Sequence, residues 1–215
     1  MKKVLIFRGG WAGHEPVETT EIVAEALRAK GVDVDIYEGN ECLEQKGFAA
    51  QYDVIVPAMT MAQISREASA ELREAVRTGT GIAGWHGGMC DAFRNDTHYQ
   101  FMTGAQFVAH PGNKIDYRVN IVSDDPIVSG IEDFDYHSEQ YYMHVDPSNE
   151  VLASTITKGV DAPWSKDVTM PVIFKRMYGE GKVFYSALGH CGEEFKVYPQ
   201  ILEITVRGIL WAMKG

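Results

Sequence analysis

The sequence of 215 residues has few cysteines, no cluster of basic residues and no long apolar run. Its three cysteines, Cys42, Cys90 and Cys191, are an odd number without C-x-x-C spacing, so neither a disulfide framework nor a thiolate zinc site is indicated. The apolar run before Arg8 is too short for a signal-peptide core. No run approaches the roughly 18 apolar residues that a membrane-spanning helix needs. We therefore expect a cytoplasmic protein with no membrane partner.

The charge balance excludes a further class of partner. Twenty basic residues stand against thirty acidic ones, which gives a formal net charge of −10. A nucleic-acid-binding protein needs a basic face, and the sequence offers none, so no nucleic-acid partner is expected. The apolar fraction of 45% and the charged fraction of 23% are typical of a globular protein. The length fits one domain over residues 1–215, with neither a linker nor an internal repeat.

The hydrophobic pattern predicts an α/β fold that changes character halfway along the chain. In the first 95 residues, apolar or alternating segments alternate with helical stripes and indicate an open parallel sheet; the segments are 4–7, 32–37, 52–58 and 81–85. We expect a helix to begin at Pro16, and another to run from a cap at Ser65 to Arg77. The second half predicts antiparallel or edge strands; these are 116–123, 136–145, 151–157 and a hairpin over 171–187. A last helix is expected over about 198–213.

The segment from Gly81 to Phe93 has the plan of a nucleophile elbow, which is a strand, a tight glycine-flanked turn and a short helix. We expect the helix to start near Gly88. The residue at the apex is His86, where such elbows carry a nucleophilic serine or cysteine, and the turn is expected to expose it. Cys90 is interpreted as a buried small residue rather than a nucleophile.

A second glycine-rich loop, over residues 9–16, superficially resembles a dinucleotide-binding loop. It lacks the G-x-G-x-x-G spacing, and Pro16 removes an amide that a phosphate would need. A nucleotide cofactor is therefore not expected.

Most of the histidines follow strands, where open α/β sheets bind their ligands. His14 follows the first strand, His86 the fourth, and His190 the strand that closes the hairpin. His110 lies in an expected loop. Each of these has a structural alternative as a hydrogen-bonded residue without a role in chemistry. His98 and His137 are interpreted as surface residues, and the seventh histidine, His144, lies on an expected strand.

Glu139, Tyr141 and His144 fall on one expected strand. The period of two places Glu139 and Tyr141 on a common face and His144 on the other, unless a bulge intervenes. Three tryptophans, Trp11, Trp85 and Trp164, lie near the candidate loops. Their rings could stack on sugars or could belong to the core.

Taken in order, these segments resemble the ThuA-like (trehalose utilisation) family of the class I glutamine amidotransferase-like superfamily. The resemblance covers nearly the whole chain and includes Gly84-Trp-His86-Gly-Gly, Gln106-Phe-x-x-His110-Pro, Glu139-Gln-Tyr141 and Gly181-Lys-Val-Phe-Tyr-x-x-Leu-Gly-His190. It implies a flavodoxin-like three-layer sandwich and a role in disaccharide or keto-glucoside catabolism. Amidotransferases of the superfamily carry cysteine at the elbow, and Pro-Glu after the catalytic histidine. This chain has His86 and Cys-Gly-Glu-Glu at those places, so glutaminase activity is not expected.

Three hypotheses follow for a carbohydrate partner. In the first, His86, His190 and Glu139 form a catalytic acid–base set, because imidazole takes and gives protons near neutral pH. The side chains that would bind the substrate are His14, Trp85, His110, Tyr141, His144 and Trp164. In the second, several of the histidines hold a divalent metal, although no H-E-x-x-H spacing demands it. In the third, the protein binds or senses a sugar without turnover. Association into a homo-oligomer is left open.

Overall fold

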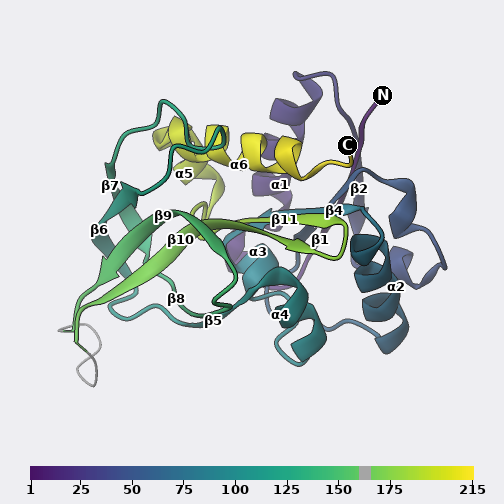
Figure 1. The fold of residues 1–215 in the computed structure, drawn as a ribbon, viewed down its shortest axis with the longest axis horizontal. Helices are drawn as coiled ribbons and strands as arrows, with labels where there is room; N and C mark the ends of the chain where they lie inside the picture. The colour runs from purple at the N-terminus through teal and green to yellow at the C-terminus, as the bar shows by residue number, and fades with distance from the viewer. Residues whose placement is uncertain (160–165) are drawn as a thin grey trace.

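A central sheet with helices on both faces dominates the fold, which a computed structural model describes for residues 1–159 and 166–215 (Figure 1). The nine strands of the sheet lie in the order β2-β1-β3-β4-β11-β10-β9-β6-β7, and a separate two-stranded sheet pairs β5 with β8. The first five strands in this order are parallel, and the pairings from β11 to β7 are antiparallel. The predicted flavodoxin-like α/β class, with antiparallel strands added in the second half, is confirmed.

The strands match the apolar pattern of the sequence closely. Their bounds are β1 Lys3–Arg8, β2 Asp33–Glu38, β3 Val54–Ala58, β4 Gly81–Trp85, β5 Ala105–Ala109, β6 Lys114–Ile121, β7 Phe134–Glu139, β8 Tyr142–Val145, β9 Glu150–Thr157, β10 Val168–Tyr178 and β11 Gly181–Ser186. In β1 the continuous run from Val4 to Phe7 is fully buried, as a parallel strand with covered faces requires.

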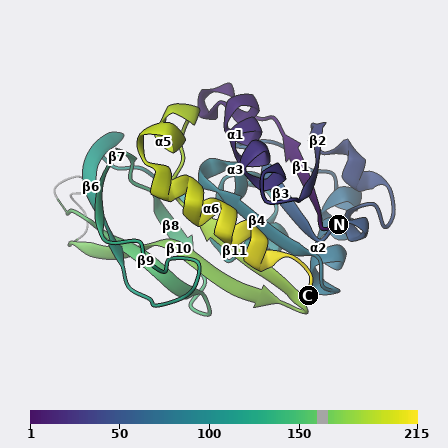
Figure 2. The same cartoon turned by 90° about the horizontal axis from the view of Figure 1, so that it is seen from above.

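The helices form the two outer layers. They are α1 Pro16–Arg28, α2 Arg66–Arg77, α3 His86–Cys90, α4 Thr97–Thr103, α5 Gly192–Val197 and α6 Pro199–Ala212, with 3-10 turns η1 Ala12–His14, η2 Glu41–Glu44 and η3 Ala49–Gln51. Helices α1, α5 and α6 cover one face of the sheet, and α2, α3 and α4 cover the other (Figures 1 and 2). No helix in the described ranges is long and apolar enough to cross a membrane.

Two helix starts confirm the predicted signals. Pro16 is the first residue of α1, where its missing amide costs nothing. Ser65 caps α2, and its hydroxyl accepts a hydrogen bond from the amide of Ala68 at 3.1 Å.

The structure corrects three expectations. The helix of the elbow begins at His86 itself rather than near Gly88. Residues 105–109 form a strand where a loop was expected. The single strand expected over 136–145 is divided into β7, which belongs to the large sheet, and β8, which pairs with β5. The division falls at the buried Gln140, whose side-chain amide donates to Thr155 Oγ1 at 2.7 Å and to the carbonyl of Ile156 at 3.2 Å.

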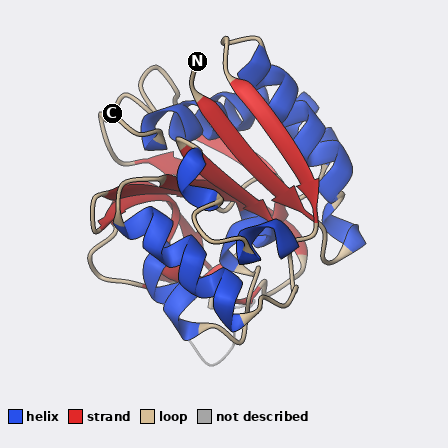
Figure 3. Cartoon of the chain, turned by 90° about the vertical axis from the view of Figure 1, so that its right-hand side faces the viewer, coloured by secondary structure: helices blue, strands red, loops and turns tan. Residues whose placement is uncertain are grey.

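The parallel half of the sheet sets the position of the site. Strands β1, β3, β4 and β11 run in one direction, so the segments that follow them meet at the same edge (Figure 3). His14, Thr60, His86 and His190 lie in those four segments. The predicted convergence at the carboxyl edge is thus observed.

Candidate functional site

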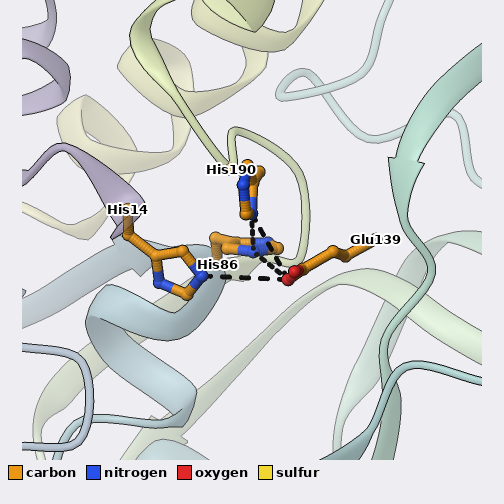
Figure 4. A group of neighbouring side chains, drawn as sticks. All are labelled: His14, His86, Glu139 and His190. Atoms are coloured by element: carbon orange, nitrogen blue, oxygen red, sulfur yellow. Dashed lines mark hydrogen bonds and ion pairs between the residues drawn. The ribbon is translucent and has the colours of Figure 1, made fainter. Parts of the chain in front are cut away.

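Four side chains from distant parts of the sequence meet at this edge (Figure 4). We call His14, His86, Glu139 and His190 the Glu139 cluster; one nitrogen or oxygen of each lies within 4.8 Å of the others. His14, His86 and His190 follow β1, β4 and β11, whereas Glu139 ends β7 in the antiparallel half. All four residues are at most 9% exposed.

His86 lies at the centre of the cluster, in a left-handed backbone conformation with φ of 45°. This is a strained value for a residue with a Cβ atom, and it places the ring at the apex of the elbow. The hydroxyl of Tyr185 donates to the carbonyl of His86 at 3.1 Å and fixes the turn. The expected exposure of the ring is wrong: His86 is 1% exposed, because Tyr141 stacks on it at 4.1 Å between ring centroids.

The two ring nitrogens of His86 have different partners. Nδ1 lies 2.8 Å from the carbonyl oxygen of Ala187, which can only accept, so Nδ1 carries the hydrogen. Nε2 lies 3.2 Å from Glu139 Oε2 and 3.3 Å from His190 Nδ1. The hydrogen bond from Nδ1 to Ala187 therefore fixes the tautomer of the neutral ring and directs Nε2 into the cluster.

Glu139 brings the cluster together through both carboxylate oxygens. Oε2 lies 3.2 Å from His86 Nε2, 3.3 Å from His190 Nδ1 and 3.8 Å from His14 Nε2. Oε1 points the other way and lies 3.8 Å from His110 Nε2. His110 thus adjoins the cluster without belonging to it.

Thr60 and Gly87 hold the ring of His14 in its place within the cluster. Its Nδ1 lies 2.8 Å from Thr60 Oγ1, which leaves Nε2 for Glu139. A Cβ atom at position 87 would lie only 2.6 Å from His14 Cε1, so the elbow has room for this ring only because residue 87 is glycine.

Burial and close contacts shift the ionisation of the cluster. Burial, together with charge on His14 and His190, lowers the pKa of His86 to about 4 despite the hydrogen bonds to Glu139 and Ala187, so this ring is neutral at pH 7. For Glu139, burial alone would raise the pKa. The nearby imidazoles of His14, His190 and His86 outweigh burial, hold the pKa well below its usual range and keep the carboxylate ionised.

A pocket of about 130 Å³ opens onto the cluster, and we call it the Glu139 pocket. Its lining combines polar and aromatic side chains; these include Trp11, His14, Asp91, Arg94, Phe107, His110, Glu139 and Tyr141. Trp11 is 46% exposed, and its indole meets the His14 ring edge-on at 4.7 Å between centroids. A larger groove of about 320 Å³ lies between α2 and α4, but none of the cluster residues lines it.

The predicted site residues divide into three groups. His14, His86, Glu139 and His190 converge, and Tyr141 and His110 adjoin them. Trp85 and His144 are not brought to the pocket: Trp85 is 3% exposed and packs on Phe195, and His144 is exposed on β8. Trp164 lies outside the described residues.

Three further residues of the site were not predicted from the sequence. Thr60 orients His14, and the buried Asp91 binds Arg94 through two hydrogen bonds of 2.6 and 2.8 Å at the pocket. Glu194 accepts hydrogen bonds from the amide of His190 at 2.9 Å and from Ser138 Oγ at 2.8 Å. Of the three, only Glu194 could have been predicted, because an acidic side chain four residues after His190 can accept a hydrogen bond from the backbone amide of His190.

The elbow presents an imidazole where a thiolate nucleophile would stand. Cys90 is buried in α3, as expected, and burial raises the pKa of its thiol well above the usual value. Burial also raises the pKa of the Cys191 thiol. Neither cysteine is therefore activated as a nucleophile.

The chain is similar to one protein family over nearly its whole length. The sequence model of the family described as ThuA, trehalose utilisation, matches residues 3–212. None of the curated proteins matches the chain.

Several solved structures share the fold. A ThuA-like protein from Parabacteroides merdae is 18% identical with a TM-score of 0.77, and the match covers 98% of this chain and 89% of that one. A ThuA-like protein from Bacteroides uniformis is 17% identical with a TM-score of 0.75, covering 98% and 91%. A cytoplasmic protein from Salmonella typhimurium is 15% identical with a TM-score of 0.65, covering 99% and 100%. At these identities the likeness shows the fold alone.

Proposed function

Because the chain belongs to the ThuA (trehalose utilisation) family, we propose that it is an enzyme that acts on a small carbohydrate in the Glu139 pocket. The observation that carries the proposal is the position of Glu139. Its carboxylate lines an open pocket, and nitrogen atoms of four histidines lie within 3.8 Å of its oxygens. Titratable groups gathered in this way at a pocket are typical of catalytic sites.

The chemistry that these groups support is proton transfer to and from a sugar. An imidazole of the set accepts a proton from a hydroxyl group, or from a C–H bond beside a carbonyl, and ionised Glu139 stabilises the positive charge that forms on the ring. Within the set of His86, His190 and Glu139, neutral His86 contributes an acceptor, because its hydrogen is committed to Ala187. The side chain of His110 is 32% exposed and adjoins Glu139 Oε1, so a bound substrate can reach its ring.

The size of the pocket limits the substrate. At about 130 Å³ it is smaller than the ~300–1,000 Å³ usual for ligand pockets, so it admits the reacting end of a ligand and leaves the remainder outside. The exposed ring of Trp11 offers a sugar ring an apolar face beside the opening. A disaccharide or a keto-glucoside fits this description, with one ring at Glu139 and the other at Trp11.

The test is turnover of a substrate panel by the full chain. Trehalose, other disaccharides and their 3-keto forms are incubated with the protein, and the products are identified by mass spectrometry. We expect one class of sugar to be converted, and Glu139→Gln to lower kcat by about 10²–10⁴-fold, the usual contribution of a general acid or base.

The control is His144→Gln, which removes an exposed histidine on β8 outside the pocket and is expected to leave the rate unchanged. Saturable sugar binding without any product would favour a binding protein over an enzyme. Full activity of Glu139→Gln would remove the carboxylate from the mechanism.

A further inference from the structure

We infer that His14, His86, Glu139 and His190 form a binding site for one divalent first-row transition metal ion. The site goes beyond the proposed function and does not depend on it. Among the residues that the structure describes, this is the one group of histidine, cysteine and acidic side chains close enough to share an ion.

The spacing of the four atoms fits a metal. A tetrahedral ion with nitrogen and oxygen ligands at about 2.0–2.2 Å holds neighbouring ligand atoms about 3.3–3.6 Å apart. In the cluster, Glu139 Oε2 lies 3.2 Å from His86 Nε2, 3.3 Å from His190 Nδ1 and 3.8 Å from His14 Nε2. The His86 and His190 nitrogens are 3.3 Å apart. The widest separations, within 4.8 Å, need to shorten by about an ångström around such an ion.

The orientation of the rings supports the same conclusion. A histidine that binds a metal through one nitrogen commonly donates the other N–H to a carbonyl or another oxygen. His86 Nδ1 donates to the carbonyl of Ala187, which leaves a lone pair on its Nε2, and the contact of His14 Nδ1 with Thr60 Oγ1 turns the Nε2 atom of His14 towards the cluster.

With His86 neutral, protons alone leave one contact of the cluster unsatisfied. His190 Nδ1–H can donate to Glu139 and to His86 together, but the contact of 3.2 Å between His86 Nε2 and Glu139 Oε2 then joins two lone pairs. Buried acceptors that face each other carry a large cost, and a cation between them removes it. A shared ion would satisfy both acceptors without a second proton on His86.

The donor set selects the class of ion. Three imidazoles and one carboxylate, without a thiolate, suit Zn²⁺, Mn²⁺, Fe²⁺ or Co²⁺, whereas Mg²⁺ and Ca²⁺ prefer sites made of oxygen ligands. Because His14 and Glu139 line the Glu139 pocket, an ion held there faces a ligand entering from outside. An ion in this position would polarise a sugar oxygen, and His110 would remain as the proton acceptor outside the four ligands.

The experiment measures metal content of the untagged full chain in the absence of sugar. The protein is stripped with a chelator, incubated separately with Zn²⁺, Mn²⁺, Co²⁺ and Mg²⁺, desalted and analysed by mass spectrometry of the elements. We expect about one transition metal ion per chain and no retained Mg²⁺. Co²⁺ is expected to give the visible absorption of a site with nitrogen ligands.

Variants separate a built site from surface binding. We expect His14→Gln to abolish retention of the ion. Thr60→Val, which removes only the outer partner of His14, is expected to weaken affinity by about 10–100-fold. His137→Gln, an exposed histidine on β7, is the matched control and keeps the wild-type stoichiometry.

The outcomes are distinct. The inference requires close to one ion per wild-type chain. Less than about 0.1 ion per chain after incubation with each of the three transition metals would therefore overturn it, independently of the results for the variants. Equal retention by His14→Gln and the wild type would overturn it as well. Metal binding without sugar turnover would refute the proposed function only, and turnover by metal-free protein would leave that function standing without the ion.

Discussion

Gly87 shows how a single residue sets the spacing of the site. An added Cβ atom would lie 2.6 Å from His14 Cε1 and 2.9 Å from the Tyr141 hydroxyl. Gly87→Ala is therefore expected to displace His14 from the cluster and to lower metal retention and sugar turnover together. The cost in unfolding free energy should be about 1–3 kcal/mol, as for other overpacked sites. Denaturant titration and metal analysis measure the two effects.

A double-mutant cycle separates this clash from a general defect of the turn. In a His14→Ala background the ring that the new Cβ atom meets is absent, so most of the destabilisation by Gly87→Ala should disappear. If the two substitutions are additive, the glycine acts through Tyr141 or the backbone of the elbow rather than through His14.

The buried ring of His86 makes the metal-free protein sensitive to acid. Its pKa is lowered to about 4 by burial, against 6.5 in the unfolded chain, so the unfolded state binds the extra proton between these values. The contribution of this ring to the free energy of unfolding is therefore fully present above pH 6.5. It falls by up to about 3 kcal/mol as the pH drops towards 4, at 1.4 kcal/mol per pH unit. The lowered pKa of Glu139 adds a loss in the same direction, below its unfolded pKa of 4.5.

Urea titrations of chelator-treated protein at pH 7, 6 and 5 measure this dependence. His86→Gln should flatten the profile between pH 6.5 and 5, whereas His137→Gln, on the exposed side of β7, should follow the wild type. Identical profiles for wild type and His86→Gln would show that folding does not lower the pKa of this ring.

At the scale of elements, the break between β7 and β8 lies between Glu139, which belongs to the cluster, and Tyr141, which stacks on His86 beside it. The alternation of the sequence predicts a strand through this region, and it correctly assigns Glu139 and Tyr141 to a common direction and His144 to another. It does not show that the chain changes sheets at Gln140. The reason is long-range: the partners of Gln140 are Thr155 and Ile156, in a strand that local pattern does not place next to it.

Gln140→Ala tests the role of this break. Loss of the two buried hydrogen bonds is expected to cost about 1–3 kcal/mol of unfolding free energy. Because the bonds fix the residue between Glu139 and Tyr141, metal affinity should also fall. Gln51→Ala, at an exposed position of η3, is the control and should change neither quantity. A stable variant with unchanged metal affinity would show that β7 alone positions Glu139.

At the scale of the whole molecule, the parallel strands make the site partly predictable. His14, His86 and His190 follow strands whose direction is readable from apolar runs and turn residues, so their meeting at one edge follows from topology. The residues that orient these histidines are harder to predict from the sequence. Thr60 and Asp91 are ordinary loop and helix-end residues in the sequence, and only the packing of β3 against α3 brings them to the pocket.

The same topology predicts how a metal would act on the whole molecule. The four ligands lie in separate segments, at residues 14, 86, 139 and 190, so one ion ties both halves of the sheet together. An ion present at a concentration 100 times its Kd stabilises the folded state by about 2.7 kcal/mol. Hydrogen exchange that needs an opening with loss of the ion should therefore slow by about 100-fold. Hydrogen exchange with and without Zn²⁺ should therefore show joint protection of segments 9–14, 86–90, 139–141 and 187–190. In His14→Gln that joint protection should vanish, and protection of a single segment in the wild type would mean that the ion binds outside the cluster.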